Sequence, residues 1–123
     1  MGMHKDLQRF FVNLEEIWRT RKPDRIRELM SGKFKYYEDP FSDPITDISE
    51  LISTWREIET QDLRVLEIKP LFSADRAGAA MWECTVGLPD GTRMNMKGVY
   101  LVELDRSGRC SLFRQWWNED TNS

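Results

Sequence analysis

The chain has 123 residues and a formal net charge of −3, and 40% of its residues are hydrophobic. This size fits a single domain, and the apolar and aromatic content is too high for a disordered chain. The charge balance lacks the surplus of Lys and Arg that nucleic-acid binding by charge requires, and no apolar run approaches the roughly 20 residues of a membrane span. The first residues also lack the apolar stretch of a secretory signal, so we expect a cytoplasmic protein that binds neither nucleic acid nor membrane.

Two cysteines and one histidine limit the chemistry that the chain can perform. Cys84 and Cys110 lie far apart in apolar stretches, which predicts two reduced, buried thiols, and there is no CxxC pair to hold zinc. His4 is the single histidine, which excludes a Ser-His-Asp triad and an HExxH zinc site. We therefore expect no bound metal, and any enzymatic activity would need no cofactor.

Helical periodicity dominates the first part of the chain. Apolar residues recur at helical spacing over residues 5–20, and Pro23 suits the first position of a short second helix that Ser31-Gly32 would end. Residues 34–38 predict a first strand. A capping signature at Asp47, with an acid three residues later, predicts a third helix through about residue 58.

The rest of the chain predicts four antiparallel strands, over residues 63–72, 77–88, 92–104 and 109–118. Asp90-Gly91 predicts a two-residue hairpin turn between the second and third of these strands. Together the elements predict an α+β domain in the order α-α-β-α-β-β-β-β, with a core from about residue 5 to residue 118. Its sheet is expected to be antiparallel or mixed, curved, and wrapped around the helices.

The hairpin turn decides which side chains share a face of the sheet. A two-residue turn places Glu83, Met96 and Tyr100 on one face and Trp82 on the other. A bulge or a turn one residue longer would reverse this, so that Glu83 would face solvent and Trp82 would face inward.

Both faces of the predicted sheet carry apolar side chains, so both need cover. The helices cover one face, and we expect a second copy of the chain to cover the face that bears Trp82 and Trp116. The alternative is that loops or the C-terminal tail cover it. Phe113, Gln115 and Trp117 are expected on the opposite face of the last strand from Trp116.

Five stretches, taken in order, form a recognisable family pattern. They are the amphipathic first helix, YYEDP at 36–40, the helix ending in STWREI, GVYLVELDRSGRC at 98–110 and FRQWW at 113–117. With this order the chain resembles the superfamily named after nuclear transport factor 2, in its SnoaL-like and ketosteroid-isomerase-like branch. The resemblance covers residues 7–118 and implies a cone with an apolar pocket at its open end. Members include enzymes, transport factors and proteins of unknown role, so fold does not settle function.

The resemblance implies two catalytic positions. Asp39 matches the aspartate of the isomerase E-D-P motif, which moves a proton next to a ketone. Tyr100 falls where an isomerase places a protonated acid that stabilises the enolate oxygen. The oxyanion tyrosine of the isomerases is missing, because Leu14 stands near its place. The alternatives are that Asp39 shapes a turn and that Tyr100 is a core tyrosine.

The remaining candidates would line a ligand pocket with aromatic walls, an adaptable side chain, a second acid and a polar anchor. They are Leu14, Trp18, Trp55, Glu83, Met96, Phe113, Gln115 and Trp117. The sequence thus predicts a small-molecule pocket protein that, if enzymatic, is an isomerase, cyclase or dehydratase of a compact apolar carbonyl compound, with Asp39 as general base. The alternative is a non-catalytic homodimeric binding or interaction module whose pocket is filled as core.

Overall fold

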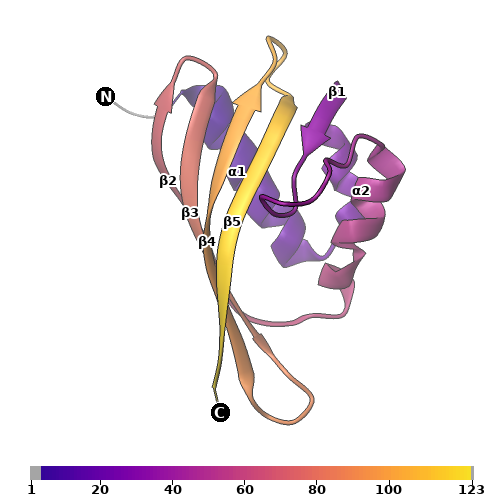
Figure 1. Cartoon of the computed structure of the whole chain (residues 1–123), viewed down its shortest axis with the longest axis vertical. Coiled ribbons are helices and arrows are strands. Elements are labelled where there is room, and N and C mark those ends of the chain that lie inside the picture. The colour runs from indigo at the N-terminus through magenta and orange to yellow at the C-terminus, as the bar shows by residue number, and fades with distance from the viewer. Residues whose placement is uncertain (1–3, 123) are drawn as a thin grey trace.

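A computed structural model describes residues 4–122, and its elements follow the predicted order. They are helix α1 (Lys5–Thr20), 3-10 helix η1 (Pro23–Glu28), strand β1 (Met30–Tyr36), helix α2 (Ile48–Trp55), 3-10 helix η2 (Arg56–Glu59), and strands β2 (Asp62–Ala74), β3 (Ala77–Gly87), β4 (Arg93–Leu104) and β5 (Cys110–Asn122). The predicted α+β class is confirmed. Figure 1 shows the sheet with α1 behind it and α2 beside β1.

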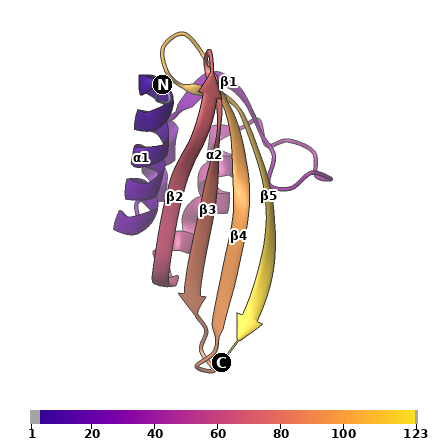
Figure 2. The same cartoon turned by 90° about the vertical axis from the view of Figure 1, so that its left-hand side faces the viewer.

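The five strands form one open, mixed sheet in the order β1-β5-β4-β3-β2. Strands β2 to β5 pair antiparallel with their neighbours, whereas β1 pairs parallel to β5. Figure 2 shows the sheet curving along its length, with α1 lying against one side. The core lies between the helices and this inner face, because the helices cover only one side of the sheet.

Helix α1 forms for the reasons that its sequence predicts. The side chain of His4 caps its first turn by accepting a hydrogen bond from the backbone N–H of Asp6, 3.1 Å away. Arg21 ends it in the left-handed conformation, with φ 57°. The apolar stripe of the helix is buried, and it consists of Leu7, Phe10, Phe11, Leu14, Ile17 and Trp18. This stripe holds the helix against the sheet.

Strand β1 begins earlier than the sequence predicts. Ser31-Gly32 was expected to end a helix, but both residues lie inside the strand. The cause is a pairing that local sequence does not show: β1 runs beside β5, with Met30 opposite Cys110. The backbone N–H of Cys110 also donates to the carbonyl of Leu29, 2.8 Å away. Long-range pairing thus overrides the local turn signal.

The hairpin between β3 and β4 differs from the predicted two-residue turn. Leu88 and Thr92 close a loop of three residues, in which Gly91 has a φ of 88°. The extra residue shifts the pairing so that Trp82 lies opposite Gly98 and Glu83 lies opposite Lys97. The predicted two-residue turn was therefore wrong, and the alternative of a longer turn is confirmed.

This shift separates the two tryptophans that were expected on one sheet face. Trp82 is only 5% exposed and packs among core residues on the inner face. Trp116 lies opposite Val99 on the outer face and is exposed. A dimer face that contains both Trp82 and Trp116 is therefore wrong, because a strand sends adjacent register positions to opposite sides of the sheet.

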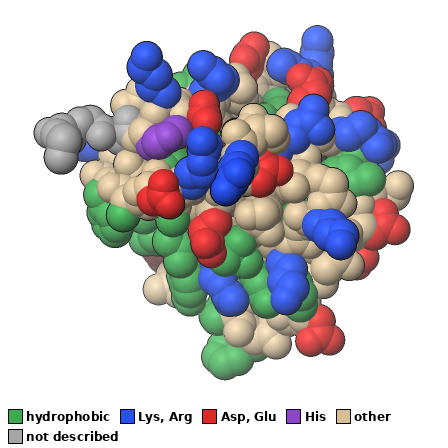
Figure 3. Space-filling view, turned by 90° about the horizontal axis from the view of Figure 1, so that it is seen from above, with side chains coloured by type: hydrophobic (Ala, Val, Ile, Leu, Met, Phe, Trp, Pro, Cys, Tyr) green, Lys and Arg blue, Asp and Glu red, His purple; other side chains and the backbone are tan. Residues whose placement is uncertain are grey.

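The surface mixes the two signs of charge. Figure 3, seen from above, shows Lys and Arg side chains interspersed with Asp and Glu side chains. Among the described residues, four of the nine salt bridges join two exposed side chains, as between Arg56 and Asp24 at 3.1 Å. Such pairs contribute little to stability, so burial of the core has the main role. Within residues 4–122, each helix is too short or too polar to cross a membrane.

Candidate functional site

A partly open cavity of about 580 Å³ lies between the inner face of the sheet and the helices. Its walls come from the end of α1, from β1 and the residues after it, from α2 with η2, and from β3, β4 and β5. Six aromatic side chains line it: Trp18, Tyr36, Trp55, Trp82, Tyr100 and Trp117. A space of this size and lining is typical of a small-molecule site.

Packing holds the aromatic walls in fixed orientations. Trp18 and Trp55 meet edge to face, with ring centroids 5.3 Å apart and an interplanar angle of 88°. The indole N–H of Trp18 donates to the side-chain oxygen of Gln61 at 2.9 Å. Trp82 and Tyr100 stack nearly parallel, with centroids 5.3 Å apart. These contacts join α1, α2 and the sheet around one space.

The indole of Trp82 lies across Gly98, and this glycine makes room for it. A Cβ placed on Gly98 would lie 2.8 Å from Nε1 of Trp82. That Nε1 is buried and has no hydrogen-bond partner among the described residues. A buried donor without an acceptor is costly, so the packing of this indole against Gly98 is made at the expense of a hydrogen bond.

The polar lining of the cavity is acidic. Glu38, Glu57, Asp62 and Glu119 line it, together with uncharged side chains such as Gln115. Among the described lining residues there is no Lys, Arg or His. No group of three or more His, Cys, Asp or Glu side chains within residues 4–122 is placed to hold a metal ion.

The two tyrosines of the cavity stay protonated at neutral pH. Burial raises the pKa of Tyr36 and of Tyr100 above the ordinary range of a phenol. Each hydroxyl is therefore a neutral hydrogen-bond donor, which is the form that stabilises a developing negative charge on an oxygen.

Asp39 does not line the cavity. It lies after β1, where its carboxylate accepts hydrogen bonds from the N–H of Phe41 at 2.8 Å, and from the N–H and hydroxyl of Ser42 at 2.9 and 2.6 Å. The hydroxyl of Ser42 and then the N–H of Phe41 lower the pKa of Asp39. These are the contacts of a turn former, which is the alternative that the sequence offered.

The structure brings most of the other predicted site residues together. Six of them line the cavity: Trp18, Trp55, Met96, Tyr100, Gln115 and Trp117. Leu14 and Phe113 lie in the core without lining it. Glu83 faces outward, 3.7 Å from Nζ of Lys97, so it does not line this cavity.

Tyr36, Glu38 and Glu57 are among the cavity residues that were missed from the sequence. Strand alternation could have found the first two, because Phe34 and Tyr36 are buried and the next residue of that parity is Glu38. The resemblance instead directed attention to Asp39. Glu57 lies one helical turn after Thr54, which also lines the cavity.

No family model matches the chain, and no curated protein sequence matches it. Solved structures match the chain in fold. One is SalBIII, an epoxide hydrolase/cyclase-like enzyme with a role in pyran ring formation in the polyether salinomycin. It is 15% identical to this chain with a TM-score of 0.70, and the match covers 94% of this chain and 95% of that chain. A steroid delta-isomerase from Pseudomonas aeruginosa is 14% identical with a TM-score of 0.72, and the match covers 96% of this chain and 83% of that chain. A computationally designed 17-OHP binder is 14% identical with a TM-score of 0.69, covering 89% and 92%. The chain therefore has the cone-shaped nuclear transport factor 2-like fold that its sequence resembles.

Proposed function

We propose that the chain binds a compact, ring-bearing small molecule in the cavity between sheet and helices. The observation that supports this most is the cavity itself, with about 580 Å³ and six aromatic side chains on its walls. A hollow of this size with mostly aromatic walls and a few polar groups is typical of a small-molecule site. The similar structures include a steroid delta-isomerase and a designed 17-OHP binder, which supports a small-molecule ligand.

Two adjacent tryptophans provide a matched test of this proposal. Trp117 lines the cavity and Trp116 lies on the opposite face of β5, yet their exposed fractions are 38% and 41%. Trp117→Ala is expected to weaken binding of 2-naphthylmethanol about tenfold, because a stacking surface is lost. Trp116→Ala should leave the affinity unchanged. Isothermal titration calorimetry measures both, and equal effects of the two variants would contradict binding in the cavity.

A cofactor-independent isomerase, cyclase or dehydratase is the second candidate, and Tyr100 supports it. Its protonated hydroxyl, on the cavity wall, suits an enolate oxygen. Asp39 as general base stays a prediction, and its turn contacts do not favour it. Glu57 lines the cavity and has a raised pKa, so it is the better-placed base.

The catalytic candidate is tested by proton exchange next to the carbonyl of 1-tetralone, followed by NMR in heavy water. If the protein catalyses this exchange, Glu57→Gln should abolish it and Asp39→Asn should not. Loss of exchange in a folded Asp39→Asn protein would return the general base to Asp39. Exchange no faster than in buffer would leave simple binding as the function.

We also infer a homodimer through the outer face of the sheet. Met81, Val99 and Trp116 form one apolar row across β3, β4 and β5, and all three are exposed. The next row holds Glu83 beside Lys97. A face that carries both signs of charge can pair with a twofold copy of itself, because each acid can meet the partner's base.

A lysine on this face should separate the two copies. Trp116→Lys is expected to give a monomer in size-exclusion chromatography with light scattering, because two buried like charges would oppose association. Val12→Lys, at an exposed position of α1, is the control and should remain dimeric. A monomeric parent protein would contradict the interface.

A cytoplasmic location is part of the proposal. Cys84 and Cys110 are free and buried. Burial raises the pKa of the Cys84 thiol to about 12, which keeps it in the unreactive protonated form. Unpaired thiols of this kind are typical of proteins in reducing compartments.

A further inference from the structure

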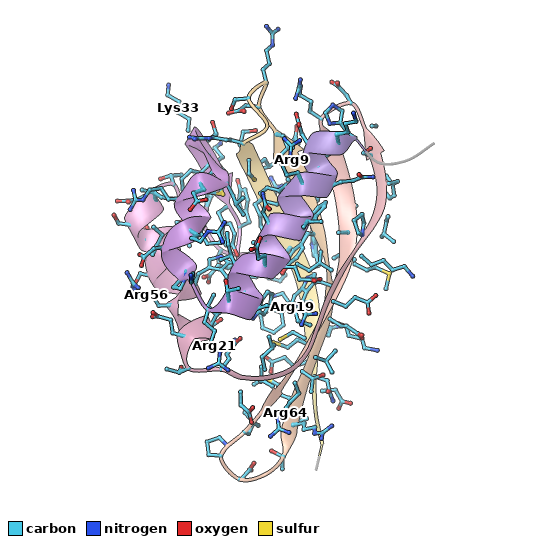
Figure 4. The ribbon with its side chains drawn as sticks, turned by 180° about the vertical axis from the view of Figure 1, so that it is seen from behind. Arg9, Arg19, Arg21, Lys33, Arg56 and Arg64 are labelled. Atoms are coloured by element: carbon cyan, nitrogen blue, oxygen red, sulfur yellow. The ribbon has the colours of Figure 1, made fainter. Side chains whose placement is uncertain are left out.

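The charged side chains that line the cavity are all acidic. Of its four acids, Asp62 is neutralised by Arg64, whose guanidinium lies 2.9 Å away. Glu38, Glu57 and Glu119 are in no ion pair with another described residue. Figure 4 shows Arg56 on the outer side of α2, pointing away from the sheet. Three carboxylates thus lie at the cavity without a protein cation.

The charges of Glu38 and Glu57 act on the same space. Partial burial raises the pKa of the Glu57 carboxyl, and the charge of Glu38 raises it further. Burial also raises the pKa of Tyr36, and the same two carboxylates add to that rise. The charge of Glu57 reaches Cys84, on β3, where it adds to the effect of burial. Glu38 and Glu57 both line the cavity, so their negative charge attracts a cation there and repels an anion.

The aromatic walls favour the same kind of ligand. The face of an indole or phenol ring carries negative charge density, and a cation that lies over it is attracted. Six such rings line this space together with the acids.

We infer that the cavity takes a ring-bearing organic cation, an amine or quaternary ammonium compound. Its positively charged nitrogen would lie beside Glu38 and Glu57, and its apolar body would lie against the tryptophans. This inference rests on the proposed function, because it assumes that the cavity is a binding site.

Three probes that share a naphthalene ring test the inference. They are 2-naphthylmethylamine, which is a cation at neutral pH, 2-naphthylmethanol, which is neutral, and 2-naphthoate, which is an anion. Their affinities for the full chain are measured by isothermal titration calorimetry at low salt. The amine is expected to bind about tenfold more tightly than the alcohol, and the carboxylate is expected to bind most weakly.

Two glutamates of η2 supply the matched variants. Glu57 lines the cavity, whereas Glu59 does not and lies 3.7 Å from Arg56. Glu57→Gln should weaken binding of the amine about fivefold and change the affinity for the alcohol less than twofold. Glu59→Gln should change neither, and the double variant Glu38→Gln with Glu57→Gln should remove the preference for the amine.

The outcomes separate the two proposals. Equal affinities for amine and alcohol, or an amine preference that survives the double variant, would overturn the inference and leave the binding function standing. Binding of none of the three probes would overturn the proposed function, and the inference with it. Thermal melting of each variant in the absence of probe confirms that the protein compared is folded.

Discussion

Replacing Gly98 with alanine is expected to lower the free energy of unfolding by about 1–3 kcal/mol, because the added methyl group has no room. Its Cβ would lie 2.8 Å from Nε1 of Trp82 and 2.7 Å from Cβ of Trp117, and it would also meet the carbonyl oxygen of Trp116. That carbonyl belongs to the paired backbone of β5. The indole of Trp82 must therefore move, and the cavity wall moves with it.

Gly32→Ala is the matched control for Gly98→Ala. Gly32 also lies in a strand, but a Cβ there meets nothing within 4 Å. We expect it to leave stability unchanged or to raise it slightly, since alanine restricts the unfolded chain. Urea denaturation gives both free energies, and near-ultraviolet circular dichroism reports the displaced indole. Similar losses for the two variants would show that the Gly98 contact is not the cause.

Truncating Phe113 to alanine is expected to lower the free energy of unfolding by about 3–5 kcal/mol, which is the range for a large buried aromatic side chain. Phe113 is 1% exposed and stacks on Tyr36 with centroids 4.6 Å apart. It also lies 4.9 Å from the ring of Tyr100 and 6.4 Å from that of Phe10. One side chain thus joins β1, β4, β5 and α1, so its loss leaves a void that rigid neighbours cannot fill.

Phe41→Ala removes the same atoms from the surface, where Phe41 is 96% exposed. Its free energy of unfolding should stay within about 0.5 kcal/mol of the parent value. Both variants are compared by urea denaturation with two independent probes, which also checks that unfolding is two-state. A cost below about 1 kcal/mol for Phe113→Ala would mean that the site relaxes around the missing ring.

The helices could be predicted from the sequence because their signals are local. The apolar stripe of α1 and the capping carboxylate of Asp47, which accepts from the N–H of Ser49 at 2.7 Å, lie within the elements that they specify. The strands were also found. The sheet register was not, because an Asp-Gly pair suits hairpin loops of both two and three residues. This difference of one residue in the loop places Trp82 on the inner face of the sheet and Glu83 on the outer face.

The candidate site, like the fold, could be predicted only where local patterns determine it. The inward alternation along β5 correctly placed Gln115 and Trp117 in one wall of the cavity. The acids were not found, because a motif matched by resemblance pointed to Asp39 while the parity of β1 sends Glu38 inward. Neither pattern shows that Glu57 lines the same cavity as Glu38, since that placement depends on how α2 and η2 pack.

The parallel pairing of β1 with β5 sets an order of assembly. Strands β2 to β5 join neighbours in the chain, whereas Tyr36 must find Phe113 across the whole intervening sequence. Contacts of such separation form late, because closing a long loop costs entropy before any contact compensates it. On the ribosome, the wall that carries Tyr36 and Glu38 therefore cannot be completed until Phe113 has emerged. The hairpins of the sheet can fold before the cavity exists, so the ligand that we propose could bind only after β5 has formed.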